Sequence, residues 1–129
     1  MKINKLDHLV LTVGDIKKTC DFYTNVLGME IVHFQEGRKA LQFGNQKINL
    51  HQLGKEFRPH ALRPTLGSAD LCFITETPME EIVEHLTKNN IPILEGPVYR
   101  TGAEGKILSV YVRDPDQNLI ELSNYSSDN

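Results

Sequence analysis

The sequence has only two cysteines, no apolar run longer than a strand near its N-terminus, and no excess of basic residues. Cys20 and Cys72 stand inside apolar patterns rather than in paired motifs, so each reads as a small buried hydrophobe. This argues against a disulfide framework and favours a reducing compartment, so we expect a cytoplasmic protein. The run Leu6 to Val13 is too short to cross a membrane and is followed by no small-residue cleavage site, which predicts neither a signal peptide nor a membrane span.

The charge balance narrows the class of partner. The chain carries 14 basic and 17 acidic residues, a net charge of −3. Without a basic excess, nucleic acid and anionic membranes are poor partners, and a small molecule is the better expectation. A chain of 129 residues is long enough to bury a hydrophobic core without disulfide bonds or bound metal ions, either as one unit or as two small modules.

In the first half of the chain, the residue pattern predicts one strand, one helix and three further strands. Hydrophobic periodicity and turn residues place the strands at 6–13, 29–34, 39–43 and 47–53, and the helix at 16–27. Asp15 is expected to cap the start of the helix, and Gly28 to follow its end.

The second half repeats that order after a polar, proline-containing linker over 54–67. Strands are predicted at 68–75, 91–95, 107–112 and 118–122, with a helix at 78–88 and a glycine-bounded loop at 96–105. Thr77, Pro78 and Glu80 have the types of a helix start, with the threonine as the cap.

This repetition predicts an α+β domain of two βαβββ modules, at about 5–53 and 68–125. Each four-stranded sheet would leave an open edge and a face dotted with polar residues. Pairing two modules could close those faces into a half-open barrel around a cavity. Because a chain of this type has edges to cover, we expect a homodimer.

Polar residues occupy matching places in the two modules. His8 lies near the start of the first strand, and Asp70 takes the same place in the second module. Near the end of each module, His51 or Asn49 corresponds to Glu121. Glu121 stands between aliphatic residues, where a carboxylate is costly unless it is paired or binds a cation.

Each of these residues also has an ordinary interpretation. Glu121 could pair with a lysine or arginine or lie at an exposed edge, and His8 could be a core histidine bonded to backbone. His51 could be half-exposed, and Asp70 could be a turn residue. The other histidines are expected either at the surface or in ordinary packing positions without a functional role: His33, His60 and His85.

Taken together, His8, His51, Asp70 and Glu121 form the type of ligand set that holds a divalent catalytic metal with open positions. Zn, Ni, Mn and Fe(II) all fit these donors. In the glycine-bounded loop, a flexible lid could hold an anionic substrate group through Tyr99, Arg100, Thr101 and Lys106.

Several segments resemble the vicinal oxygen chelate superfamily, which includes glyoxalase I, fosfomycin-resistance transferases and extradiol dioxygenases. They are DHLVLTV, DFYTNVLGMEIV, GPVYRTG and RDPDQNLIELSNY, and they span nearly the whole chain. The segments KINLH, GSADLC and RTGA are similar to the glyoxalase domain-containing protein 5 group. The resemblance implies paired βαβββ modules and a metal cavity.

Position by position, the resemblance implies His8 and Glu121 as metal ligands. The second-module histidine of glyoxalase I falls on Asp70, and a first-module glutamate falls on Asn49, with His51 two residues later. His8, His51 and Glu121 would still make a set of two histidines and one carboxylate.

The resemblance implies a metal-dependent enzyme that chelates two adjacent substrate oxygens. In a glyoxalase I-like isomerase or lyase, Glu121 would be the catalytic residue that moves a carbon-bound proton through an enediolate. Asn49, Arg100, Thr101 and Lys106 are the expected substrate-binding residues. A dioxygenase, a thiol transferase and a metal-free small-molecule-binding protein are the alternatives.

Overall fold

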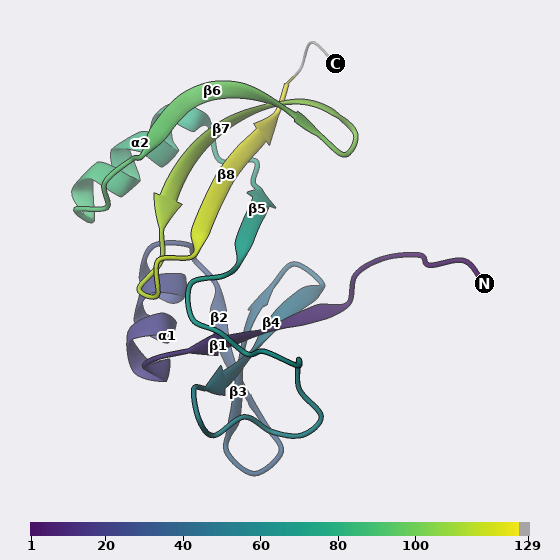
Figure 1. Cartoon of the computed structure of the whole chain (residues 1–129). Coiled ribbons are helices and arrows are strands. Elements are labelled where there is room, and N and C mark those ends of the chain that lie inside the picture. The colour runs from purple at the N-terminus through teal and green to yellow at the C-terminus, as the bar shows by residue number, and fades with distance from the viewer. Residues whose placement is uncertain (127–129) are drawn as a thin grey trace. The chain divides into compact units, whose positions relative to one another are not determined.

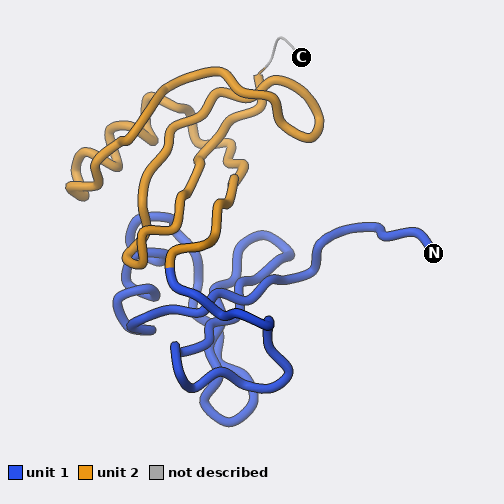
Figure 2. The backbone as a smooth tube through the Cα atoms, viewed as in Figure 1, with its two compact units in different colours: residues 1–66 blue, residues 67–129 orange. Residues whose placement is uncertain are grey.

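The computed structural model describes residues 1–126. The chain divides into two compact units, and the boundary in the sequence lies between Leu66 and Gly67 (Figure 2). Unit 1 contains β1 (His8–Val13), α1 (Ile16–Asn25), β2 (Glu30–Phe34), β3 (Arg38–Phe43) and β4 (Gln46–Gln52). Unit 2 contains β5 (Asp70–Ile74), α2 (Met79–Lys88), β6 (Glu95–Gly102), β7 (Gly105–Arg113) and β8 (Leu119–Tyr125) (Figure 1). The predicted α+β fold with two βαβββ repeats is confirmed.

Each unit has one four-stranded sheet with the same connectivity. The strand order is β1-β4-β3-β2 in unit 1 and β5-β8-β7-β6 in unit 2. In each sheet the first strand runs parallel to the last strand of its unit, and the other pairs are antiparallel. The repeat therefore sets the partners of every strand, including those that bear the candidate site residues.

The first helix forms as the sequence predicts. The Asp15 side chain accepts a hydrogen bond from the Lys18 backbone N–H at 3.1 Å, which satisfies one of the free donors at the helix start. Cys20 and Tyr23 are buried, and α1 contacts β2, β3 and β4. Beyond the helix end, Gly28 has φ +70°, a conformation that glycine adopts without strain.

The predicted threonine cap of the second helix is wrong. Pro78 is the N-cap residue, and no side chain caps the helix. Thr77 is held outside the helix, because its N–H donates to the Thr75 hydroxyl and its carbonyl accepts from the Asn124 amide. The acidic side chains of Glu80 and Glu81 in the first turn face the positive end of the helix dipole.

The predicted short strand at 91–95 and loop at 96–105 are also wrong. Glu95–Gly102 forms β6 and pairs with β7, with a register irregularity between Glu95 and Val98. Gly96, at φ +104°, fits this irregularity, since a Cβ there would lie 2.4 Å from the Ser109 carbonyl oxygen. The glycine and proline that suggested a loop therefore mark a bulge, and the 99–101 segment is part of a hairpin rather than a flexible lid.

The apolar face of each sheet forms the core of its own unit. Unit 1 buries Leu11, Val13, Leu41, Ile48 and Leu50, and unit 2 buries Val110, Val112, Ile120 and Leu122. Neither helix in the described residues has the length and apolar character needed to cross a bilayer. The opposite face of each sheet is where the polar residues gather.

Candidate functional site

Strand register places three titratable side chains side by side on the polar face of unit 2. Glu121 on β8 lies opposite Cys72 on β5 and opposite Tyr111 on β7. Since directly opposed residues share a face of a sheet, the carboxylate lies between a thiol and a phenol. Cys72 is exposed, so its expected role as a buried hydrophobe is wrong.

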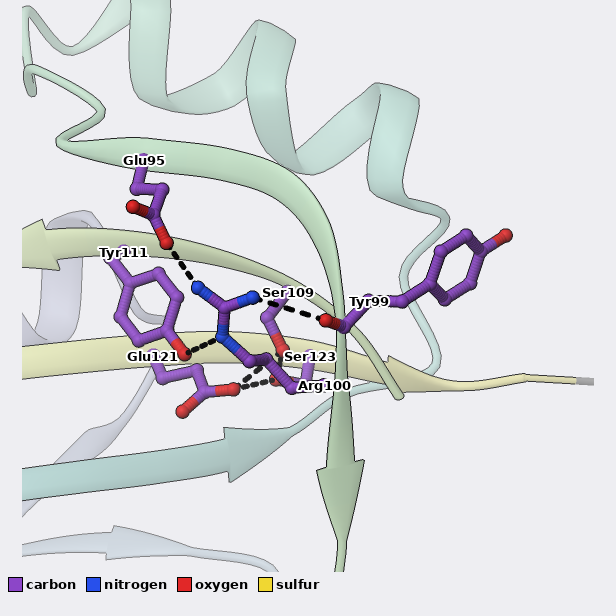
Figure 3. Close-up of polar contacts among 7 residues, drawn as sticks. All are labelled: Glu95, Tyr99, Arg100, Ser109, Tyr111, Glu121 and Ser123. Carbon is purple, nitrogen blue, oxygen red and sulfur yellow. Dashed lines mark hydrogen bonds and ion pairs between the residues drawn. The ribbon is translucent and has the colours of Figure 1, made fainter. Parts of the chain in front are cut away.

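Two serine hydroxyls hold the Glu121 carboxylate (Figure 3). The Oγ of Ser109 donates to Glu121 Oε2 at 2.6 Å, and the Oγ of Ser123 lies 3.5 Å from the same oxygen. The two hydroxyls are 2.6 Å apart, and both serines are fully buried. Among residues 1–126, Glu121 forms no ion pair, so the salt-bridge interpretation is not observed. A half-buried carboxylate with neutral donors suits a cation.

Arg100 orients Tyr111 beside this carboxylate (Figure 3). Its Nε donates to the Tyr111 hydroxyl at 3.1 Å, its Nη1 donates to the Tyr99 carbonyl at 3.2 Å, and its Nη2 pairs with Glu95. Loss of hydration is the main cause that raises the pKa of Tyr111, and Glu121 raises it further. The phenol therefore keeps its proton at neutral pH and can donate it in a hydrogen bond.

A cavity of about 400 Å³ lies over this face of unit 2. Its polar lining includes Glu121, Tyr111, Arg100 and Thr101. Its apolar lining is Ile74, Ala103, Ile107 and the Tyr125 ring, with Cys72 and Gly102 completing the wall. This volume and mixed lining fit a small organic molecule with one polar end.

The predicted site residues of unit 2 differ in their surroundings. Thr101 lines the cavity and pairs in register with Lys106, which is not among the lining residues. The Lys106 Nζ instead lies 4.8 Å from the centre of the Tyr99 ring. Asp70 is exposed at the start of β5, on the same face as Glu121.

The sequence pattern did not lead us to predict Ser109, Tyr111 and Ser123 as candidate site residues. Two signals could have found them: Ser123 follows Glu121 by two residues, and Ser109 and Tyr111 alternate in the neighbouring strand. Alternate residues share a face, so these polar residues in two apolar strands mark one polar row.

In unit 1, His8 is exposed at the start of β1, so the interpretation as a core histidine is wrong. Its Nδ1 lies 2.8 Å from Asp7 Oδ2. This hydrogen bond is the main cause that lowers the pKa of Asp7. A carboxylate on Nδ1 fixes the proton there and leaves the lone pair on Nε2, as in histidines that bind metals.

His51 and Asn49 are buried on the polar face of the unit 1 sheet, at 2% and 6% exposure. The half-exposed interpretation of His51 is therefore wrong. The Arg38 Nη2 lies 3.4 Å from His51 Nε2. Burial, and then the charge of Arg38, lower the pKa of His51, so its ring is neutral at pH 7.

The register also decides which residue of unit 1 corresponds to Glu121. Asn49 lies opposite Val10, the third residue of β1, as Glu121 lies opposite Cys72, the third residue of β5. Asn49 is therefore the counterpart of Glu121 in the repeat. By the same register, His51 lies opposite Thr12, the fifth residue of β1, and corresponds to Ser123, which lies opposite Ile74, the fifth residue of β5.

Within the part of the chain that the structure describes, three or more His, Cys, Asp or Glu side chains do not gather into a ready metal site. His8 belongs to unit 1, whereas Asp70 and Glu121 belong to unit 2. Each unit thus presents its own part of the predicted ligand set.

The repeated β-α-β-β-β unit, with a carboxylate on the open face of a sheet, defines an α+β protein of the two-module glyoxalase-like fold. The model of the Glyoxalase/Bleomycin resistance protein/Dioxygenase superfamily matches residues 5–122, and the chain belongs to this family. The predicted membership of the vicinal oxygen chelate superfamily is confirmed. The narrower likeness to the glyoxalase domain-containing protein 5 group stays a prediction.

The chain is similar to several known proteins. The virulence protein STM3117 of Salmonella typhimurium is 60% identical over 125 residues, covering 97% of this chain and 87% of that protein. Its crystal structure matches with a TM-score of 0.96, over 98% of this chain and 100% of the other. The metallothiol transferase FosB of Staphylococcus saprophyticus is 29% identical, over 93% of this chain and 76% of FosB. A lactoylglutathione lyase structure from Agrobacterium tumefaciens, 23% identical, shares the fold with a TM-score of 0.74 over 96% of each chain.

Proposed function

We propose that the chain is a divalent-metal-dependent enzyme of the glyoxalase I-like type. It would move a proton between adjacent carbons of a small substrate that has two neighbouring oxygens. The main observation in support is Glu121, a half-buried carboxylate that faces a cavity of about 400 Å³ and accepts hydrogen bonds from serine hydroxyls. A base that must take up a proton and then return it needs both a fixed position and access to the substrate.

The proposed metal ligands are His8, Asp70 and Glu121. Asp70 and Glu121 share one face of the unit 2 sheet, and the Asp7 contact leaves His8 Nε2 as a donor atom. We leave His51 out of the set, because its Nε2 faces a guanidinium cation. A divalent ion held by these oxygen and nitrogen donors would supply Lewis-acid stabilisation of negative charge on two substrate oxygens. We propose Zn, Ni, Mn or Fe(II) as the metal, with His8 supplied either by the same chain or by the partner in the proposed homodimer.

The residues of unit 2 would share the remaining work. Glu121 would take the carbon-bound proton on Oε1, while Ser109 and Ser123 hold Oε2. It would then return the proton to the neighbouring carbon, so that the reaction is an isomerisation with no external oxidant or reductant. The Tyr111 hydroxyl would donate to a substrate oxygen where charge grows.

Arg100 has a different proposed role from the anion clamp that the sequence suggests. Its charge is paired with Glu95 and its Nε is bonded to Tyr111, so it serves to position the phenol. Thr101, which lines the cavity, would contact substrate. Two proteins similar to this chain, a metallothiol transferase and a lactoylglutathione lyase, favour the proposal of metal or thiol-adduct chemistry.

Turnover of a hemithioacetal tests this proposal. We expect proton NMR to show isomerisation of the hemithioacetal of methylglyoxal and a thiol by the metal-loaded protein. EDTA should lower the rate on the order of 100-fold, and one of Ni, Mn, Zn or Fe(II) should restore it. Unchanged turnover in EDTA would contradict the proposal. Oxygen consumption with a catechol would indicate the dioxygenase alternative, and tight ligand binding without turnover or metal would indicate the binding protein.

A further inference from the structure

Among the residues that the structure describes, three buried polar atoms on the polar face of the unit 1 sheet have no hydrogen-bond partner. They are Arg38 Nε, Asn49 Oδ1 and His51 Nδ1. Asn49 and His51 are two residues apart on β4, so they share a face, and Arg38 starts the neighbouring strand β3. Buried polar atoms nearly always have hydrogen-bond partners. Three unpaired polar atoms on one face therefore indicate that a ligand binds there.

The donor and acceptor types of these atoms define what that group must be. Because His51 is neutral and its Nε2 accepts from Arg38 Nη2, its Nδ1 bears the hydrogen. Arg38 Nε–H and His51 Nδ1–H are therefore donors, and Asn49 Oδ1 is an acceptor. A matching ligand accepts two hydrogen bonds and donates one.

The charges on this face favour an anion. The guanidinium of Arg38 lies between the rings of Phe34 and Phe57, 4.9 Å and 4.5 Å from their centres, and the Lys47 Nζ lies 4.1 Å from the Phe34 ring. Among residues 1–126, neither cation forms an ion pair with a carboxylate. The Asp7 carboxylate interacts electrostatically with Lys47, and the Glu56 carboxylate with His51, but neither carboxylate is paired with these two cations. Two cations that form no ion pair, beside buried donors, favour a bound oxyanion.

Phe57 covers this cluster. Its ring lies over the Arg38 guanidinium and makes an edge contact with His51, with 5.5 Å between ring centres. Phe57 is itself 41% exposed and lies in the irregular segment between β4 and β5. A side chain without helix or sheet bonds can move aside at small cost, which gives a ligand its route to the buried atoms.

We propose that Arg38, Asn49 and His51 form a binding site for a small oxyanion that bears a neighbouring hydroxyl group, as a 2-hydroxycarboxylate does. The carboxylate accepts from Arg38 and His51, and the hydroxyl donates to Asn49. This site lies wholly within unit 1. It requires neither the metal nor Glu121.

NMR titration of the full ¹⁵N-labelled chain in EDTA tests the site. The probes are glycolate, acetate, which lacks the hydroxyl, and glycolamide, which lacks the charge. We expect glycolate to shift the Arg38 Nε–H signal saturably, and acetate and glycolamide to bind on the order of tenfold more weakly. No shift of that signal, or equal binding of all three probes, would overturn the proposal and leave ordered water as the partner of these atoms.

Matched variants locate the binding. Arg38→Met, which keeps an apolar stack, should weaken glycolate binding on the order of tenfold, and Asn49→Ala should remove only the advantage of glycolate over acetate. Arg63→Met removes an exposed cation from the covering segment and should bind glycolate as wild type does. Wild-type affinity in Arg38→Met would refute the site. If Arg38→Met does not fold, the titration of the Arg38 Nε–H signal in the wild-type protein still tests whether glycolate binds at this site. The titration involves no metal and no turnover. A negative result would therefore reject the oxyanion site without bearing on the proposed enzyme activity.

Discussion

Replacing Glu121 with glutamine is expected to lower kcat/KM for hemithioacetal isomerisation by about 1,000-fold, with the fold unchanged. Glutamine has nearly the same volume, and its carbonyl oxygen can still accept from Ser109 at the position of Oε2. It cannot take a proton from carbon, and it is a weaker ligand for a divalent cation. The measurement is steady-state kinetics at saturating metal, with circular dichroism to confirm the fold.

The control for Glu121→Gln is Glu104→Gln, which makes the same chemical change at an exposed residue of the β6–β7 connection. The Glu104 backbone N–H donates to the Tyr125 hydroxyl at 3.1 Å, and the substitution keeps that N–H, so the control should retain wild-type activity. Activity of Glu121→Gln within a few-fold of wild type would show that another residue moves the proton.

Replacing Asp114 with alanine is expected to destabilise the protein by about 3 kcal/mol. Asp114 is 3% exposed, and its Oδ1 accepts from the backbone N–H groups of Asp116 and Asn118 at 2.9 Å and 3.0 Å. Its Oδ2 accepts from the Asn118 amide at 2.8 Å, and Asn118 Oδ1 accepts from the Ala69 N–H at 2.9 Å. The variant leaves several of these buried groups unpaired.

This network also joins the turn before β8 to the start of β5, next to Asp70. Urea unfolding measures the loss of stability, and Asp21→Ala is the control, since its exposed ion pair with Lys17 should contribute little to stability. Equal stability of the two variants would show that the turn is held by other contacts.

The repeat could be predicted from the sequence because it depends on local patterns. Strand alternation, helical periodicity and the Asp15 cap act over a few residues, and all appear in the structure. The exception is β6, where Gly96 and Pro97 resemble a loop. Their strand conformation depends on pairing with β7, a contact that no local pattern shows.

The candidate site could be predicted only in part for the same reason. Glu121 stands out as an acid between aliphatic residues, but the hydroxyls that hold it come from register between two strands. Likewise, the environment of His51 is set by Arg38 and Phe57, which lie 13 and 6 residues away in the sequence. The sequence shows which residues are unusual, whereas tertiary pairing determines what each can bind.

Metal content of the purified protein, measured by mass spectrometry before and after EDTA, tests the proposed metal enzyme most directly. We expect stoichiometric divalent metal in wild type and in His33→Ala, a control that removes an exposed histidine of β2. Both His8→Ala and Glu121→Ala should lose it. Failure of the wild type to bind any of Ni, Mn, Zn or Fe(II) on titration, or full metal content in both site variants, would contradict the account.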